Sequence, residues 1–404
     1  MTLSSDDFTA ALTLVRQAAD QLDSSEQCSS ALLAMGTALG QRQDDILEAN
    51  TLDLEISRDM AVPDLVVDWL KLTPERVQTA ATVCHRLADV GTGFLFADGA
   101  AGSAYYHTRP VGIVGFIYEA FPDLGAIAAA LCIRTGNALV LRGGSEASHT
   151  NQIIASILCS SLENVGLSPD LILPVASTDI SRLDIAKCPD IDLIIPHGRP
   201  SLVDQIIRAA SVRVVPSRIG NCYLYWDASG SLERVYQMIV DSHSGAPDAV
   251  NRIEKVLLHE SHDENAVTRL WNRLQEDGFE IRADKSTAQL YSLVTAESSD
   301  WSEAYLAKTI AFRQVEDTTA ALSWINTYSS GHADSIVTVD YSESRKFVAG
   351  CRSASVYINA SPLFVRNAKQ TGEIALGISD YKGAAGGLIG LGVMRDRQRI
   401  FHGS

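Results

Sequence analysis

Basic residues are scarce in this 404-residue chain, which has 33 lysines and arginines against 49 aspartates and glutamates. The resulting formal net charge of −16 disfavours non-specific binding to nucleic acids and to anionic membranes. It still leaves room for a local basic pocket that binds a phosphorylated ligand. We therefore expect neither nucleic acid nor a membrane as a partner.

The cysteines offer neither a disulfide framework nor a metal site. They are seven in number and scattered, at positions 28, 84, 132, 159, 188, 222 and 351. No CxxC pair or Cys/His cluster has the spacing of metal ligands, so we expect no structural zinc. Reduced thiols of this kind are typical of a cytoplasmic protein, which is the location that we expect.

The sequence also lacks the patterns of a targeting segment and a membrane span. The first residues, MTLSSDDFTAALTLV, have no basic region followed by a long apolar segment, so we expect no signal peptide. The most apolar window, VGIVGFIYEAFPDLGAIAAALCI, contains Glu119, Pro122 and Asp123. These residues predict a buried strand, turn and helix in place of a membrane span.

What the sequence does contain is a long alternation of strands and helices. Helical periodicity predicts helices over residues 6–22, 26–49 and 74–91, with Thr73 capping the last of them. Further along, short apolar strands alternate with helices on both sides of about residue 228. This alternation predicts a doubly wound parallel sheet and two α/β domains that share a cleft.

The strongest local signal for a ligand is LRGGSEASHTN, residues 141–151, where a predicted strand gives way to a predicted helix. Glycines let backbone N–H groups approach an anion, a helix N-terminus favours negative charge, and Glu146 is suited to ribose hydroxyls. The residues alone leave a nucleotide-binding turn and a structural strand–helix turn equally open, since the GxGxxG fingerprint is absent. The expected contacts are Arg142, Gly143, Gly144, Ser145 and Glu146.

Three further motifs carry weaker signals. The turn PHGRP begins at residue 196 and contains Gly198; it either contacts phosphate or ribose or is an exposed loop. Cys222, at the start of GNCYLYWD, is either a packing residue or a nucleophile. We expect His332, in SSGHADSI, to form a structural hydrogen bond and not to act as a general base.

The stretch PDAVNRIEK, residues 247–255, contains no cysteine, serine or histidine. The turn before it, SHSGAPD, has the glycine and proline that an active-site loop uses. The spacing of apolar residues in PDAVNRIEK predicts that this stretch opens an amphipathic helix. The turn is therefore either a catalytic turn that has lost its nucleophile or a turn that was never catalytic.

These pieces, in this order, resemble the γ-glutamyl phosphate reductase (glutamate-5-semialdehyde dehydrogenase) family of the aldehyde dehydrogenase superfamily. The matching segments are collinear over nearly the whole chain: RPVGIVGFIYEAFPDLGAIAAALCIRTGNALVLRGGSEASHTN, IDLIIPHG, GNCYLYWD, NRIEKVLLH, YSSGHADSIVT and SVYINAS. The resemblance implies an aldehyde-dehydrogenase-like α/β fold and NADPH-dependent reduction of γ-glutamyl phosphate in proline biosynthesis. In that reaction a cysteine attacks the acyl phosphate and forms a thioester, which hydride then reduces.

The resemblance also implies a division of the chain into domains. Residues 1–101 and 111–227 are expected to form N-terminal helices and a Rossmann-type NADP domain, and residues 228–355 a catalytic-type α/β domain. Residues 102–110 and 385–404 are expected to form an arm on a neighbouring subunit, so we expect a homo-oligomer, most simply a dimer. A mixed oligomer with an active homologue or another protein is the alternative.

The chain departs from the family where the reaction takes place. The family's active-site turn has a cysteine directly before an asparagine, and Val250 stands at that position, before Asn251. Asp123 places a carboxylate where the family has a neutral amide that would face the oxyanion of the intermediate. Cationic or histidine positions of the family are occupied here by Phe121, His243, Ala246, Leu363 and Gly386.

Three hypotheses follow from these departures. The first is a binding, regulatory or scaffold protein that has lost the reductase reaction but kept the nucleotide turn, with Arg142 contacting the 2′-phosphate of NADP. The second is an active reductase with a displaced nucleophile such as Cys222, or with direct hydride attack. The third is a different enzyme that uses Asp123, His243 or Glu254 as acid–base groups. The first is favoured, because the nucleophile and the anion-binding cations are lost together.

Overall fold

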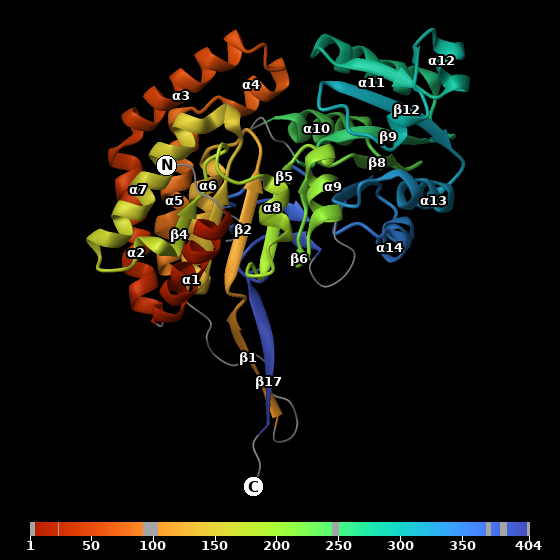
Figure 1. Cartoon of the computed structure of the whole chain (residues 1–404). Coiled ribbons are helices and arrows are strands. Elements are labelled where there is room, and N and C mark those ends of the chain that lie inside the picture. Colours follow the sequence, from red (N-terminus) through yellow and green to blue (C-terminus); the bar gives the residue numbers. More distant parts are fainter. Residues whose placement is uncertain are drawn as a thin grey trace. The chain divides into compact units, whose positions relative to one another are not determined.

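The computed structural model describes residues 5–22, 24–91, 104–244, 250–368, 373–379 and 386–401. The chain forms two compact units, which Figure 1 shows with their elements labelled. Unit 1 comprises the described residues of 1–217, 366–377 and 388–404, and unit 2 those of 218–365 and 378–387. The cofactor-binding role expected for the first part of the chain and the catalytic-type role expected for the second stay predictions.

Unit 1 contains the N-terminal helices and the first parallel sheet. Its helices are α1 (Ser5–Gln21), α2 (Ser25–Gln41), α3 (Gln43–Asp59), α4 (Asp64–Leu70), α5 (Pro74–Asp89), α6 (Asp123–Thr135), α7 (Ser148–Asn164), α8 (Arg182–Lys187) and α9 (Pro200–Ala209). Two short 3-10 turns, η1 (Ser145–Ala147) and η2 (Pro169–Leu171), flank α7. Helices α2, α5, α6 and α7 pack against one another, so the helices before the sheet form one packed layer with those that follow β2 and β3.

The single helix predicted over residues 26–49 is wrong. Helix α2 ends at Gln41 and α3 begins at Gln43, because Arg42 adopts φ −103° and ψ 24°. The Arg42 N–H still donates to the Ala38 carbonyl, so the break costs no backbone hydrogen bond at that position. The helix predicted after Thr73 is confirmed as α5: the Thr73 hydroxyl accepts a hydrogen bond from the Arg76 N–H at 3.4 Å.

The sheet of unit 1 has the order β4-β3-β2-β5-β6, with β7 beside β5. Its strands are β2 (Ile113–Tyr118), β3 (Ala138–Arg142), β4 (Ile172–Pro174), β5 (Leu193–Gly198), β6 (Arg213–Val214) and β7 (Ser217–Arg218). Strands β2 to β6 pair in parallel, and β2, β3 and β5 are buried throughout. The chain builds the sheet outward from β2 in both directions, and such a reversal places ligand sites at the carboxyl ends of the strands.

A separate two-stranded ribbon belongs to unit 1. Strands β1 (Ala104–Pro110) and β17 (Arg395–Phe401) pair antiparallel over their whole length, with Tyr106 opposite Arg399. Figure 1 shows the two strands side by side, projecting beyond the sheet of this unit. Residues 102, 103, 385 and 402–404 of the expected arm lie outside the described residues. Two further short strands, β15 (Ile378–Ser379) and β16 (Gly387–Leu388), pair with each other.

Unit 2 is built on a second parallel sheet, with the order β11-β10-β12-β9-β8-β13-β14. Its strands are β8 (Cys222–Trp226), β9 (Ile253–His259), β10 (Glu280–Ala283), β11 (Val294–Thr295), β12 (Thr309–Val315), β13 (Ala333–Val337) and β14 (Ser355–Ile358). Its helices are α10 (Leu232–His243), α11 (Glu264–Glu276), α12 (Lys285–Tyr291), α13 (Thr318–Tyr328) and α14 (Tyr341–Gly350), with the 3-10 turn η3 (Ser299–Trp301). The predicted α/β class with parallel sheets is thus confirmed in both units.

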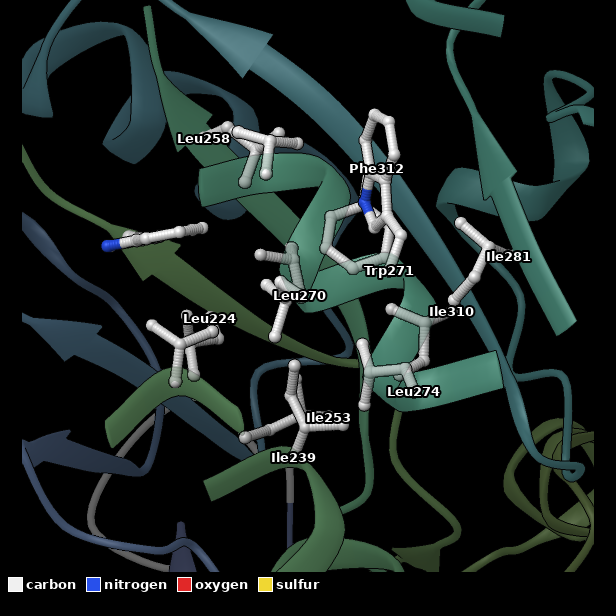
Figure 2. Packing of buried hydrophobic residues seen from close by; sticks show 14 of the residues in the cluster. Leu224, Ile239, Ile253, Leu258, Leu270, Trp271, Leu274, Ile281, Ile310 and Phe312 are labelled. Carbon is white, nitrogen blue, oxygen red and sulfur yellow. The ribbon is translucent and has the colours of Figure 1, made fainter. Parts of the chain in front are cut away.

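The core of unit 2 forms where two helices cover one face of this sheet (Figure 2). The indole of Trp271 meets the ring of Phe312 edge to face, with centroids 5.7 Å apart. Helices α10 and α11 and the strands contribute the other labelled residues, which are Leu224, Ile239, Ile253, Leu258, Leu270, Leu274, Ile281 and Ile310. Burying this apolar surface fixes β8 and β9 as central strands.

The amphipathic helix predicted to open at PDAVNRIEK is wrong. From Ile253 the segment is strand β9, which lies between β8 and β12 in the middle of the sheet. Glu254 and Lys255 are both fully buried and lie 3.5 Å apart, so their charges do not mark a solvent-facing side. The two charged residues gave the sequence a helical spacing of polar and apolar positions, although both are buried in an apolar strand. Charged residues are buried mainly in such pairs. Residues 247–249 lie outside the described residues.

Candidate functional site

A candidate site is a pocket of about 280 Å³ in unit 1, which we call the β3 pocket. It lies at the carboxyl ends of β2, β3 and β4, beside the first turn of α7. Its lining residues are Tyr118, Leu141, Gly143, Gly144, Ser148, Asn151, Gln152, Pro174, Val175, Ala176, Ser177 and Asp179. This is the edge of the sheet where the strand order predicts a ligand.

The first glycine of the turn, Gly143, is required by close packing. The Tyr118 hydroxyl donates to Asn151 Oδ1 at 2.8 Å, and Asn151 Nδ2 donates to the Gly144 carbonyl at 3.1 Å. A Cβ on Gly143 would lie 2.2 Å from Asn151 Nδ2, so no other residue fits at position 143 without displacing this link. The glycine at position 143 therefore has a structural reason that is independent of any phosphate.

Arg142 does not line the β3 pocket. Its guanidinium donates to the carbonyls of Gly143, Ser177 and Ile180, the last two at 3.4 Å, and the residue is 5% exposed. Burial lowers the pKa of Arg142 to about 10, which leaves the side chain protonated at neutral pH. In this geometry Arg142 holds the loop after β4 against the end of β3. The contact with a 2′-phosphate that the sequence suggested stays a prediction.

A short 3-10 turn lies between the glycines and the helix that follows them. Ser145 and Glu146 belong to the 3-10 turn η1, and α7 itself starts at Ser148. The first free N–H groups of α7 are bound by the carboxylate of Asp53 in α3, which accepts from His149 N at 3.0 Å and from Thr150 N at 2.8 Å. Asp53 is 2% exposed. A protein carboxylate thus occupies the α7 N-terminus, where the sequence pattern suggested a phosphate.

A second protein carboxylate occupies the turn that contains Gly198. Glu119, at the end of β2, accepts from Arg199 N at 3.1 Å and from Arg199 Nη2 at 2.6 Å. Gly198 has φ 145°, and a Cβ there would lie 2.9 Å from both Cβ and Oε2 of Glu119. The PHGRP turn is therefore tied to the end of β2, and Gly198 is required by conformation and by space.

The turn after β2 is satisfied within unit 1. Phe121 is fully buried, stacks on Trp69 with centroids 5.0 Å apart, and meets His197 edge to face at 5.2 Å. Asp123 accepts hydrogen bonds from Nε and Nη2 of Arg76, and both side chains are nearly buried. The aromatic ring at position 121 and the carboxylate at position 123 thus have structural partners of their own.

Val250 lies at the position where the family resemblance expects the nucleophile. It is fully buried, and its carbonyl accepts from Gly220 N at 2.9 Å at the start of β8. Asn251, also buried, donates from Nδ2 to the Pro362 carbonyl at 3.0 Å, in the segment that contains Leu363. An aliphatic side chain at position 250 has no atom that can attack an acyl phosphate.

Cys222 lies close to this position but has the features of a structural thiol. Its Sγ is 4.0 Å from the Val250 carbonyl oxygen, and the side chain is fully buried. Burial, and next the negative charge of Asp334, raise the pKa of the thiol well above its usual range. The reactive form of a cysteine is the thiolate, so this environment disfavours nucleophilic attack.

The remaining acid–base candidates are engaged in backbone contacts. Glu254 accepts from the N–H groups of Tyr305 at 2.6 Å and Leu306 at 3.0 Å. His243 Nε2 donates to the Ile253 carbonyl at 2.9 Å, and His332 Nε2 donates to the Arg218 carbonyl at 2.9 Å. His332 thus forms the structural hydrogen bond that was predicted. Ala246 lies outside the described residues.

Sequence reasoning missed three residues that shape the site: Asp53, Arg76 and Asp179. Asp53 and Arg76 lie on helices far along the chain from the groups that they bind, and neither sits in a recognisable motif. Asp179 follows a short strand in an ordinary turn, where its N–H donates to the Ala176 carbonyl at 3.2 Å. Asp179 could have been counted among the charges around the expected nucleotide turn only if the end of β4 had been placed beside that turn.

The comparison with known proteins settles the family. A curated Synechocystis protein named γ-glutamyl phosphate reductase 2 is 41% identical over 416 residues, which cover 99% of each chain. The chain belongs to the γ-glutamyl phosphate reductase family. A γ-glutamyl phosphate reductase of Gloeobacter violaceus is 34% identical over 387 residues and covers 93% of this chain and 91% of its own. No family model matches the sequence.

Solved structures place this family member in the expected fold. The crystal structure of γ-glutamyl phosphate reductase from Thermotoga maritima covers 98% of both chains with a TM-score of 0.89 and 28% identity. An acetylating aldehyde dehydrogenase from Geobacillus thermoglucosidasius matches with a TM-score of 0.70 at 16% identity, which shows the fold alone. The aldehyde-dehydrogenase-like fold is thereby confirmed. None of the described helices is long and apolar enough to span a bilayer.

Proposed function

We propose that this member of the γ-glutamyl phosphate reductase family binds a nicotinamide dinucleotide but does not reduce γ-glutamyl phosphate through a thioester. It then acts as a binding, regulatory or scaffold protein. Val250 carries the proposal, because a fully buried aliphatic residue stands where the reaction needs a thiolate. The seven unpaired thiols support a cytoplasmic location.

Two further features support the loss of the reaction. Cys222 is a buried thiol whose pKa is raised, so it does not replace the missing nucleophile. Asp123 and Phe121, which stand where the family has an amide and a cation, are bound to Arg76 and packed on Trp69. Both side chains are therefore engaged within unit 1, and neither offers a donor for an oxyanion.

The residues of the β3 pocket would hold the cofactor. Asp179 in the lining provides an acceptor for a ribose hydroxyl, and Glu146 lies beside the lining at Gly144. Tyr118 and Asn151 hold the turn by their hydrogen bond. A bound nicotinamide supplies a hydride. Without a nucleophile at position 250, however, the chain holds no acyl group to receive that hydride. Retention of a nucleotide pocket without a nucleophile fits a protein that responds to the cofactor and does not consume it.

The decisive experiment measures the reverse reaction. Purified protein is mixed with NADP or NAD, pyrroline-5-carboxylate and phosphate, beside an authentic reductase, and reduced cofactor is followed by absorbance. We expect no turnover above background with either cofactor. Turnover that Cys222→Ala abolishes would contradict the proposal and establish a displaced nucleophile. Cys84→Ala is the matched control, because Cys84 is equally buried but lies in unit 1.

A scaffold function also predicts that the protein binds another protein. A mixed oligomer with an active reductase predicts that the two chains co-purify when they are expressed together with a tag on only one of them. The active chain alone provides the control for activity. If the reductase has the same activity and elutes at the same volume with and without this protein, a role as its subunit is excluded.

A further inference from the structure

We infer that the β3 pocket prefers a dinucleotide whose adenosine ribose carries a free 2′-hydroxyl, the NAD(H) class, over one with a 2′-phosphate, and that Asp179 sets this preference. The inference rests on the proposed nucleotide binding and refines it. It departs from the NADPH that the family resemblance implies, because the residues of this pocket do not suit a second phosphate.

The charge of the pocket lining is the first observation. Among the described residues that line the β3 pocket, Asp179 carries the only formal charge, and neither lysine, arginine nor histidine is among them. The 2′-phosphate of NADP brings up to two negative charges. Entering the pocket, it would exchange water for a carboxylate of the same sign, with no cation in the lining to offset the repulsion.

The cation nearest in sequence is already engaged. Arg142 donates to the carbonyls of Gly143, Ser177 and Ile180, and it is not itself among the lining residues. The charges of Glu146 and Asp179 both favour its protonated form. The charge of Arg182 opposes that form, so the charges around Arg142 are mixed, and its guanidinium is engaged by three carbonyls before any ligand arrives. Turning Arg142 toward a phosphate would leave the carbonyls of Ser177 and Ile180 without these donors.

The same contacts fix Asp179 in place. Ser177 and Ile180, which Arg142 holds by their carbonyls, stand on either side of it in the chain. The Asp179 N–H donates to the Ala176 carbonyl at 3.2 Å, which closes the turn. These contacts fix the backbone at Asp179, and therefore the point from which its carboxylate extends.

The hydrogen-bonding chemistry points to a hydroxyl. Glu146 Oε2 is a buried oxygen for which the described residues supply no hydrogen-bond donor. It lies close to the turn, since a Cβ on Gly144 would be 2.5 Å from it. A carboxylate oxygen accepts hydrogen bonds, and a ribose hydroxyl donates them. A 2′-phosphate in its dianionic form has acceptors only, so it removes one of the two ribose donors that could reach this oxygen.

Titration calorimetry of the purified full-length protein tests the inference without relying on catalysis. The probes are NADH and NADPH, together with ADP-ribose and its 2′-phosphate, which lack the nicotinamide. We expect each 2′-hydroxyl ligand to bind at least about tenfold more tightly than its 2′-phosphate counterpart at low salt. Asp179→Asn should narrow this ratio to about threefold or less, chiefly by strengthening the binding of the phosphate forms.

Asp184→Asn provides the matched control. Asp184 is an exposed residue five positions along the chain that caps α8 with Ser181 and does not line the pocket, so its variant should keep the wild-type ratio. NADPH binding as tightly as NADH would overturn the preference and leave nucleotide binding intact. Absence of binding by all four ligands would overturn the preference together with the nucleotide part of the proposed function. An equal change in the ratio for both aspartate variants would show that net charge, not Asp179, sets it.

Discussion

Glu119 and Arg199 form an ion pair that joins the carboxyl ends of β2 and β5, with 2.6 Å between Oε1 and Nη2. The two partners are unequally buried: the glutamate side chain is 3% exposed and the arginine side chain 42%. Removing one partner therefore has a different effect on the remaining side chain in each case. A lone Arg199 would be hydrated, whereas a lone Glu119 would be a buried, uncompensated charge.

This asymmetry predicts the order of stability of two variants. Arg199→Ala should cost about 3 kcal/mol, and Glu119→Ala about 1.5 kcal/mol, because only the first strands a buried charge. Scanning calorimetry should show the larger fall in Tm for Arg199→Ala. Arg199→Lys, which keeps the charge, should fall between Arg199→Ala and the wild type. The reverse order for the two alanine variants would mean that Glu119 is not the buried member of the pair.

The Arg76–Asp123 pair predicts that Asp123 stabilises the protein. Asp123→Asn restores the neutral amide of the family but leaves the nearly buried Arg76 without its carboxylate. We expect Asp123→Asn and Arg76→Gln each to be destabilising and the double variant to be less so than their sum. The coupling energy should be about 1–3 kcal/mol in urea unfolding. A coupling near zero would show that the pair contributes nothing to folding.

Val250→Cys should not restore a reductase. Position 250 is fully buried, and burial raises the pKa of a thiol and depletes the thiolate. The cations that would hold the phosphate are also missing at Leu363 and Gly386. Together these losses should exceed about 4 kcal/mol, or roughly a thousandfold in rate.

The measurement is the pyrroline-5-carboxylate assay described above, with the authentic enzyme as reference. Near-normal activity in Val250→Cys would show that this residue alone silences the site. Activity that recovers only when Phe121→Arg, Asp123→Asn and Leu363→Arg are added would show that several positions of the site have diverged. Folding of each variant is checked by its Tm, because Asp123→Asn is expected to destabilise unit 1.

His197 predicts a loss of stability in mild acid. It is fully buried, with Nδ1 2.8 Å from the Ser217 hydroxyl, and burial lowers its pKa from 6.5 to about 3. Between these two values the unfolded chain binds the proton and the folded chain does not, so stability falls as the pH drops below 6.5. The contribution at pH 5 is about 2 kcal/mol relative to pH 8.

His197→Gln should remove this part of the pH dependence, since an amide does not titrate. Its Tm is expected to be below that of the wild type at pH 8 and to fall less on going to pH 5. Asp334 works in the opposite direction: burial raises its pKa to about 6, so the folded chain is the one that holds its proton. A wild-type and a His197→Gln protein with parallel pH profiles would show that His197 already binds its proton in the folded state at pH 5.

The β1–β17 ribbon predicts self-association. Tyr106 is 38% exposed and Phe401 64% exposed, and both edges of a two-stranded ribbon have unpaired backbone groups. We expect a homodimer at micromolar concentration by multi-angle light scattering, in line with the arm that the family resemblance implies. Phe401→Asp and Tyr106→Asp should shift the equilibrium toward monomer. A wild-type monomer at these concentrations would refute the prediction.

The fold could be predicted from the sequence because the strands of both sheets are short apolar runs bounded by turn residues. The errors came where charge and periodicity gave the wrong indication. Glu254 and Lys255 are a buried pair in β9, and a sequence pattern cannot show that two neighbouring charges lie inside the protein. Arg42 separates α2 from α3 by its backbone angles alone, with no glycine or proline at that position.

The candidate site was predicted only in part for a different reason. The turn at Arg142, Gly143 and Gly144 was recognisable from local pattern, and it does line or border a pocket. Its charges are determined by partners from distant segments, such as Asp53 and Asp179. Such long-range pairs follow from tertiary packing, which no local spacing encodes. The position of the turn could therefore be predicted from the sequence, and its electrostatics could not.

The cap that Asp53 places on α7 has a consequence for how the molecule opens. The amide hydrogens of His149 and Thr150 are bound to a carboxylate on a helix almost a hundred positions away. They exchange with solvent only when these bonds to Asp53 break, so their exchange rates report on the contact between α3 and α7 as well as on the fraying of a single turn. The rigidity of the first turn of α7 is thus supplied by the amino-terminal part of the chain.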